Sequence, residues 1–140
     1  MKIPIKEVNI QGKRGVNFPV AKIIPGECMG SGLGSIDSFG DYDIMSTHPA
    51  SQGLRMGDFV AIEDHYCKFG FAYVKDAITV GTIVHGACLD SGHGPGFMPI
   101  LSCKSKELTV SLDKESNLRR YLDDGNQGQE QEETSGEEGA

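Results

Sequence analysis

Tryptophan is absent from the 140-residue sequence, and aromatic side chains make up only 7% of it. With so few flat side chains, the chain has no evident platform on which nucleic-acid bases could stack. The Lys and Arg residues are scattered along the chain and do not form the basic cluster that phosphate binding needs. We therefore expect no nucleic-acid partner.

Long apolar runs and paired cysteines are also missing. No run approaches the roughly 18 apolar residues that a membrane-spanning helix needs, and the N-terminal stretch MKIPIKEVNIQGKRG is unlike a secretory signal. The four cysteines, Cys28, Cys67, Cys88 and Cys103, are far apart and form no CxxC pair. This usage favours free thiols in a reducing compartment, so we expect a cytoplasmic protein with no membrane partner.

The C-terminal stretch DDGNQGQEQEETSGEEGA, residues 123–140, has no Lys, no Arg and no large apolar side chain. It holds seven of the twenty acidic residues, and the remaining thirteen equal the thirteen Lys and Arg, so the net charge of −7 belongs to this tail. Such a segment cannot bury enough apolar surface to offset its ordering entropy. We expect one β-rich domain over residues 1–122 and a disordered acidic tail over 123–140, which either solubilises the protein or docks on a basic partner.

Helical periodicity is not evident before Ser111, and Gly is frequent at 19 residues. Short β-branched or alternating runs separated by Gly, Pro and Asp predict strands. The predicted strands are Ile3–Val8, Val16–Ile24, Tyr42–Met45, Asp58–Glu63, Ile78–His85, Phe97–Ser102 and, more weakly, Leu108–Leu112.

Two runs predict how their strands are buried. In GLRMGDFVAIED, a polar turn precedes a strand in which Phe59 and Ala61 face one side while Val60 and Ile62 face the other. The run DAITVGTIVHG is nearly all apolar, which predicts a central strand covered on both faces. Gly81 inside it predicts a bulge or a close backbone approach.

Little helix is expected. The best candidate is Lys114–Leu122, with Asp113 as the N-cap, two arginines in the last turn and Gly125 just beyond. A short helical turn near Pro49–Gly53 is also predicted, because Pro suits a first helical position. The many short strands predict a mainly β fold, specifically a small closed or partly open β-barrel with one short C-terminal helix.

One group of candidate binding residues lies in PGECMGSGLGSIDSFGDYD. A phosphate-cradling loop would need a helix directly after its glycines, whereas turn-forming residues follow here. Close approach of a ligand to the Gly-rich backbone remains one interpretation, and a tight connection is the other. The candidate ligand-binding residues are Gly30, Ser31, Gly32, Asp41 and Asp43.

Two further stretches carry acid, imidazole and thiol groups. In EDHYCKF, strand alternation would place Glu63 and His65 on one face and Asp64 on the other. In HGACLDSGHGPGF, the histidines His85 and His93 are eight residues apart, which matches no helical zinc motif. Cys28 and Cys88 would be nucleophiles only if a histidine lay close to one of them.

Two histidines with one carboxylate form a donor set suited to Zn²⁺ or Mn²⁺. We expect Asp64, His85 and His93 to be catalytic and metal-binding residues, with Asp41 or Asp43 as other carboxylates that could complete the site. The alternative is structural: His85 ends a buried strand and Gly-His-Gly-Pro-Gly is a rigid turn.

Several phrases together resemble one family: IIPGECMGSGLG, GDYDI, LRMGDFVAIEDHYCKFGFAY, AITVGTIVHG and GHGPG. In this order they resemble the C-terminal half of a prokaryotic family catalogued as domain of unknown function 4438, over about Val20 to Cys103. The resemblance implies that the same Gly-rich segments are shared family features. It also implies longer relatives, so we expect the family's N-terminal half to be missing from this chain.

Two functions follow as hypotheses. The first is a metal- or small-ligand-binding protein with hydrolase-like chemistry, in which a divalent metal polarises a carbonyl or activates water. The second is a non-catalytic subunit or assembly module that forms a homo-oligomer or pairs with a separately encoded partner subunit.

Overall fold

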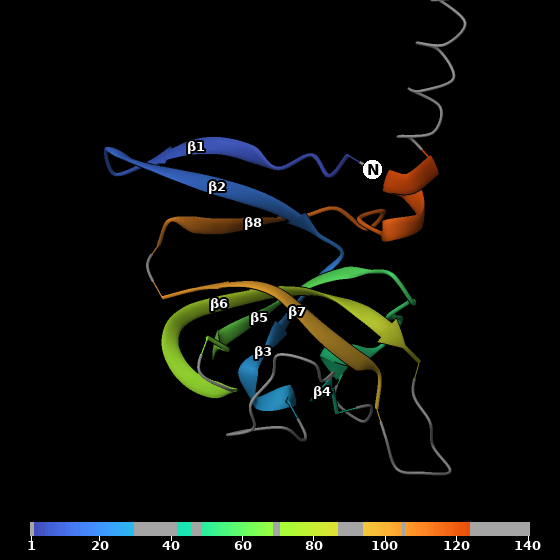
Figure 1. Cartoon of the computed structure of the whole chain (residues 1–140). Helices are drawn as coiled ribbons and strands as arrows, with labels where there is room; N and C mark the ends of the chain where they lie inside the picture. The colour runs from blue at the N-terminus through green and yellow to red at the C-terminus, as the bar shows by residue number, and fades with distance from the viewer. Residues whose placement is uncertain are drawn as a thin grey trace, which may run out of the picture.

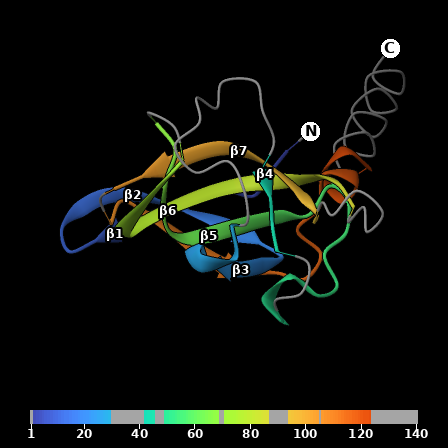
Figure 2. The ribbon, with the colours of Figure 1, turned by 90° about the horizontal axis from the view of Figure 1, so that it is seen from below.

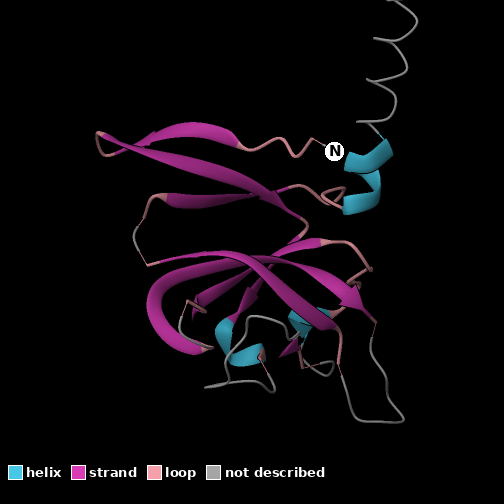
Figure 3. Ribbon diagram, viewed as in Figure 1, coloured by secondary structure: helices cyan, strands magenta, loops and turns pink. Residues whose placement is uncertain are grey.

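Strands account for most of the structure, which is a computed structural model that describes residues 2–29, 42–45, 49–68, 71–86, 94–104 and 106–123. The strands lie in two layers (Figures 1 and 3). They are β1 (Lys6–Ile10), β2 (Lys13–Val20), β3 (Lys22–Pro25), β4 (Tyr42–Asp43), β5 (Phe59–Tyr66), β6 (Ala72–His85), β7 (Gly96–Cys103) and β8 (Leu108–Leu112). Two short 3-10 helices, η1 (Gly26–Cys28) and η2 (Pro49–Ser51), and a helix at 118–123 complete the described elements.

The first sheet has three strands in the order β1-β2-β8. β1 and β2 form an antiparallel hairpin, while β8 lies parallel to β2. The hairpin turn places Gln11 and Gly12 at positive φ, 51° and 82°, and the Asn9 side chain accepts a hydrogen bond from the Gly12 N–H at 2.9 Å. Positive φ at both central residues is the geometry that suits the twist of a two-residue hairpin.

The second sheet has five strands in the order β3-β5-β6-β7-β4. Figure 2 shows β7, β6, β5 and β3 side by side. β3 is parallel to β5, and the other neighbours are antiparallel. The predicted single strand Val16–Ile24 is therefore wrong: it breaks at Ala21, whose N–H bonds to the carbonyl of Phe59, and its two halves belong to different sheets.

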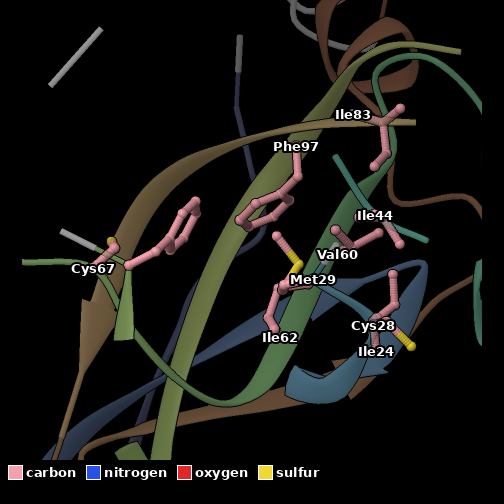
Figure 4. Packing of buried hydrophobic residues seen from close by; sticks show 10 residues of the cluster. Ile24, Cys28, Met29, Ile44, Val60, Ile62, Cys67, Ile83 and Phe97 are labelled. Atoms are coloured by element: carbon pink, nitrogen blue, oxygen red, sulfur yellow. The ribbon is translucent and has the colours of Figure 1, made fainter. Parts of the chain in front are cut away.

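Two hydrophobic clusters lie on opposite faces of the second sheet. One fills the space between the sheets and includes Phe18, Phe59, Ala61 and Tyr121. The other, shown in Figure 4, lies on the far face; its members are Ile24, Cys28, Met29, Ile44, Val60, Ile62, Cys67, Phe71, Ile83 and Phe97. The predicted alternation from Phe59 to Ile62 is confirmed, because Phe59 and Ala61 belong to the first cluster and Val60 and Ile62 to the second.

β6 is a central strand between β5 and β7, as predicted, and it is covered on both faces. The register of β6 against β7 shifts between Val80 and Gly81. A Cβ atom at Gly81 would lie 2.3 Å from the Met98 carbonyl oxygen and 2.6 Å from the Phe97 ring. The predicted bulge and the predicted close approach are both present.

The C-terminal helix starts later than predicted, at residue 118. Asp113 caps a preceding turn, since its carboxylate accepts the Glu115 N–H at 3.0 Å, and Asn117 caps the helix by accepting the Arg119 N–H at 2.8 Å. The reason is tertiary: the buried Ser116 donates a hydrogen bond to the Pro19 carbonyl at 2.7 Å, which holds the intervening segment against β2. The helical turn predicted near Pro49 is confirmed as η2.

The mainly β class with one short helix is confirmed. No closed barrel is found among the residues that the structure describes, so the barrel stays a prediction. None of the described helices is long and apolar enough to cross a membrane. Residues 124–140 of the predicted tail lie outside the described residues.

Candidate functional site

Three of the eight predicted site residues, Asp43, Asp64 and His85, lie in the described structure. The other five lie outside the described residues; they are Gly30, Ser31, Gly32, Asp41 and His93. A shared metal site would require the side chains of Asp43, Asp64 and His85 to lie close together.

Asp43 and His85 do come together, across the end of β7. Both residues are register partners of Gly96, Asp43 from β4 and His85 from β6. The His85 Nε2 atom lies 3.8 Å from the Asp43 Oδ1 atom, and the two side chains are 41% and 19% exposed. The pair is thus partly shielded but open to solvent on the His85 side.

Chain segments flanking the two Gly-rich stretches meet beside this pair. Residues 30–41 follow Met29, which forms an isolated bridge with Ile44. Residues 87–93 lead into Gly94 and Pro95, and the Ile44 N–H donates to the Pro95 carbonyl at 2.9 Å. The described ends of both stretches therefore lie at the Asp43–His85 end of the second sheet.

The proton on the His85 ring can be assigned from its neighbours. The Nδ1 atom lies 2.9 Å from the Gly86 carbonyl oxygen, which can only accept a hydrogen bond. Nδ1 therefore carries a proton, and Nε2 is the atom that faces the Asp43 carboxylate. When the His85 ring is neutral, the lone pair of Nε2 lies beside the Asp43 carboxylate. When Nε2 is protonated, the ring and the carboxylate form an ion pair.

The separation of these two atoms is close to that of two ligands of one metal ion. With metal–ligand distances of about 2.1 Å, two ligands at a tetrahedral angle are roughly 3.4 Å apart. The observed 3.8 Å between Nε2 and Oδ1 requires only a small adjustment. Within the described ranges, however, no group of three or more His, Cys, Asp or Glu side chains is placed to hold a metal ion.

Asp64 is not brought to His85. It lies at a β-bulge between Glu63 and His65, with φ of 55°, and its carboxylate accepts the Asp76 N–H at 2.8 Å. Glu63 pairs with Ile78, seven positions before His85 on β6, which is roughly 20 Å along the strand. We therefore leave Asp64 out of the site, because one metal ion cannot bridge that distance.

The same bulge corrects the predicted alternation at the end of β5. Glu63 is exposed, whereas His65 is only 1% exposed and faces the interior. The positive φ at Asp64 interrupts the strict alternation of sides on which the prediction depended. Glu63 and His65 therefore do not form a joint ligand set.

Cys28 has the environment of a structural thiol. It is buried in the cluster of Figure 4, and burial, with a smaller contribution from the Glu27 carboxylate, raises the pKa of its thiol. A raised pKa keeps the sulfur protonated and poorly nucleophilic. Cys88, the other cysteine considered as a nucleophile, lies outside the described residues.

Sequence reasoning missed a hollow of about 580 Å³ beside the C-terminal helix. Three arginines line it: Arg55, Arg119 and Arg120. Arg55 lies 3.3 Å from the Asp58 carboxylate and Arg120 lies 3.0 Å from that of Asp113. Glu115 and Asp123 also line the hollow, so acids balance the arginines and the hollow is not an evident anion site.

Comparison with known proteins gives a family and a fold, and no activity. The family model "Domain of unknown function (DUF4438), C-terminal" matches residues 6–122. The crystal structure of TM1086 is similar with a TM-score of 0.73 and 36% sequence identity, over 85% of this chain and 42% of that one. A comparison with curated proteins finds no match. The chain therefore belongs to the DUF4438 family and contains that family's C-terminal domain.

Proposed function

We propose that the domain binds a divalent metal ion, Zn²⁺ or Mn²⁺, through Asp43 and His85. The observation that carries the proposal is the 3.8 Å separation between the His85 Nε2 and Asp43 Oδ1 atoms, with Nδ1 held by the Gly86 carbonyl. A hydrogen bond at the second ring nitrogen is how metal-binding histidines are usually oriented. One imidazole and one carboxylate are donors that both ions accept.

The chemistry implied is that of a Lewis acid. A metal ion with only two ligands from this pair has positions left for water or for an oxygen of a small polar ligand, and it would polarise that ligand or activate the water. The role of Asp43 and His85 is to fix the ion at the partly exposed end of β4 and β6. This is the hydrolase-like part of the proposal.

Calorimetric titration of the untagged, chelator-treated chain with ZnCl₂ and with MnCl₂ tests the site. We expect saturable binding of one ion per chain and a rise in Tm that depends on metal concentration. His85→Ala and Asp43→Asn should each weaken the affinity by 10-fold or more, because the first removes the imidazole ligand and the second replaces the carboxylate with a neutral amide. The matched control is Glu7→Gln, which removes an exposed carboxylate 3.9 Å from Arg14 and should bind metal like the wild type.

Two results would contradict the proposal. One is a wild-type chain that binds neither ion at millimolar concentration. The other is undiminished binding by both site variants, which would place the ion elsewhere.

A second proposal, favoured by the comparison, is that the domain is an assembly module. The family model describes a C-terminal domain, and this chain spans 42% of the similar TM1086 chain. Partners would be a second copy of this chain or a separately encoded subunit. A cytoplasmic location is part of the same proposal, supported by the free thiol of the buried Cys28.

Light scattering coupled to size exclusion tests the assembly module. We expect a mass above that of the 15.1 kDa chain, or a stable co-purifying subunit. A single 15.1 kDa species across the micromolar range, without a co-purifying protein, is the result that would exclude it.

A further inference from the structure

His65 is the one described histidine that lies inside the protein. It is 1% exposed on β5, and its ring meets the ring of Phe71 edge-on, with 4.0 Å between the ring centroids. Its Nδ1 atom lies 2.9 Å from the Thr79 hydroxyl oxygen on β6. The stability of a buried imidazole depends on which of its two nitrogen atoms carries a proton and on whether each nitrogen has a hydrogen-bond partner.

The hydroxyl groups around the ring determine where its proton lies. Thr79 has one hydroxyl proton, and the His65 carbonyl oxygen, which can only accept, takes it at 2.8 Å. The Ser102 hydroxyl on β7 lies 3.2 Å from that of Thr79 and accepts the Cys67 N–H at 3.2 Å. The His65 Nδ1 atom is therefore a donor to the Thr79 oxygen.

The other ring nitrogen, Nε2, is buried and has no hydrogen-bond partner among the residues that the structure describes. With Nδ1 protonated, Nε2 carries a lone pair, and the neutral ring fits its surroundings. Burial accordingly lowers the pKa of His65 from 6.5 to about 4. A second proton on the ring would place an unpaired N–H and a positive charge beside the Phe71 ring.

Within the described part of the chain, no acid on the elements around His65 compensates that charge. The charged residues next to His65 on β5, on β6 and after β7 are all exposed or half-buried, and none bonds Nε2; they are Glu63, Asp64, Lys68, Lys75, Asp76 and Lys104. Asp64 is engaged by the Asp76 N–H, and Lys104 lies over the Tyr66 ring at 4.7 Å. The thiol of Cys67 is buried and uncharged in acid.

We propose that His65 is an acid-sensitive latch that joins the ends of β5, β6 and β7 and opens when Nε2 is protonated. The hydrogen bonds that open are those among His65, Thr79, Ser102 and the Cys67 N–H. The hairpin end beyond the bulge, where His65 pairs with Tyr73 and Tyr66 with Ala72, loses this attachment to β7. The rest of the second sheet, from Phe59 to Ile62, has its own register with β6 and stays closed.

The sign of the pH dependence follows from the two pKa values. In the open form His65 titrates near its ordinary 6.5, and in the closed form near 4, so the open form binds more protons between these values. Opening is thus suppressed above pH 6.5 and favoured as the pH falls towards 4. The opening equilibrium constant should rise about 30-fold between pH 7.5 and pH 5.

Hydrogen exchange of the full chain, corrected for the intrinsic effect of pH, measures this opening. We expect amides of 65–68 and 71–73 to lose about 30-fold in protection from pH 7.5 to pH 5, while those of 59–62 change less than threefold. His65→Gln, which cannot titrate, should abolish the change. His85→Gln, which removes the exposed histidine at the other end of β6, should leave it intact.

Nitrogen NMR of the wild-type chain keeps the test independent of whether His65→Gln folds. The expected signature is a neutral His65 ring with its proton on Nδ1 at pH 7 and no titration above pH 5. The proposal is overturned if the proton lies on Nε2, if His65 titrates near 6.5, or if protection of 65–73 is independent of pH.

Discussion

Gly81→Ala lowers the free energy of unfolding by about 3 kcal/mol, the upper end of the range for over-packing, because its methyl group has no space. The Cβ atom would lie 2.3 Å from the Met98 carbonyl oxygen, which belongs to the backbone of β7, and 2.6 Å from the Phe97 ring. Phe97 is fully buried in the far-face cluster, so its ring cannot swing aside. The strands must separate where β6 carries a bulge. Urea unfolding followed by circular dichroism measures the loss.

Gly86→Ala is the matched control on the same stretch of chain. A Cβ atom at Gly86 would meet nothing within 4 Å, and the residue follows directly after β6. Its unfolding free energy should stay within about 0.5 kcal/mol of the wild type. Equal urea midpoints for Gly81→Ala and Gly86→Ala would show that β7 can move away from Gly81 at no cost, which would contradict the tight packing of β7 against this residue.

Asp58→Ala is the second large effect, about 2–3 kcal/mol of lost stability. The Asp58 carboxylate is buried at the start of β5, where it accepts the Arg55 N–H at 2.8 Å and the Asn117 side-chain amide at 2.9 Å. Removing it leaves both donors without this acceptor. It also removes one of the hydrogen bonds that join residues 55–58 to Asn117, the residue that caps the C-terminal helix. Thermal and urea unfolding of the variant measure the cost.

A double-mutant cycle separates this network from a general loss of packing. Asn117→Ala should be costly in the wild type and cost at least 0.5 kcal/mol less when Asp58 is already alanine, because the two share a hydrogen bond. Glu7→Ala, which breaks an exposed carboxylate–arginine contact of 3.9 Å, should change stability by less than about 0.5 kcal/mol. Strict additivity of Asp58→Ala and Asn117→Ala would show that the hydrogen bond between the two side chains does not contribute to stability.

Local pattern was enough to predict much of the second sheet. Alternating Phe59, Val60, Ala61 and Ile62 predicted a strand with two buried faces, and these residues divide between the two clusters. Gly81 within an apolar run predicted a bulge, which is present. These signals are reliable because each arises from neighbours in the chain and from the two-residue period of a strand.

What the sequence left open depends on contacts between distant residues. The run from Val16 to Ile24 looks like one strand, but its first part pairs with β8 and its last part with β5, and the break falls at Ala21, which bonds to Phe59. The helix begins at 118, and not at 114, because Ser116 is held by Pro19. Neither partner is close in sequence, so periodicity and capping preferences could not reveal them.

In the candidate site, too, local sequence predicted some features, while others depend on contacts between distant residues. The acids and histidines were identified from their Gly-rich surroundings, and Asp43 was one of several acids considered for His85. Its selection over Asp64 depends on β4 and β6 both pairing with Gly96 of β7, which is a matter of register. The bulge that turned His65 inward carries no Gly or Pro signal, since Asp64 itself adopts the positive φ.

The strand order also constrains how the chain can fold during its synthesis. β1 and β2 come first, all of the second sheet follows, and β8 then returns to pair with β2. The sheet that contains the β1–β2 hairpin can therefore form completely only after residues 108–112 have left the ribosome. Until then, the hydrophobic cluster between the two sheets is partly exposed to solvent. Such distant pairing slows folding and exposes unfinished strand edges. Nascent chains stopped before residue 108 should depend most on chaperones.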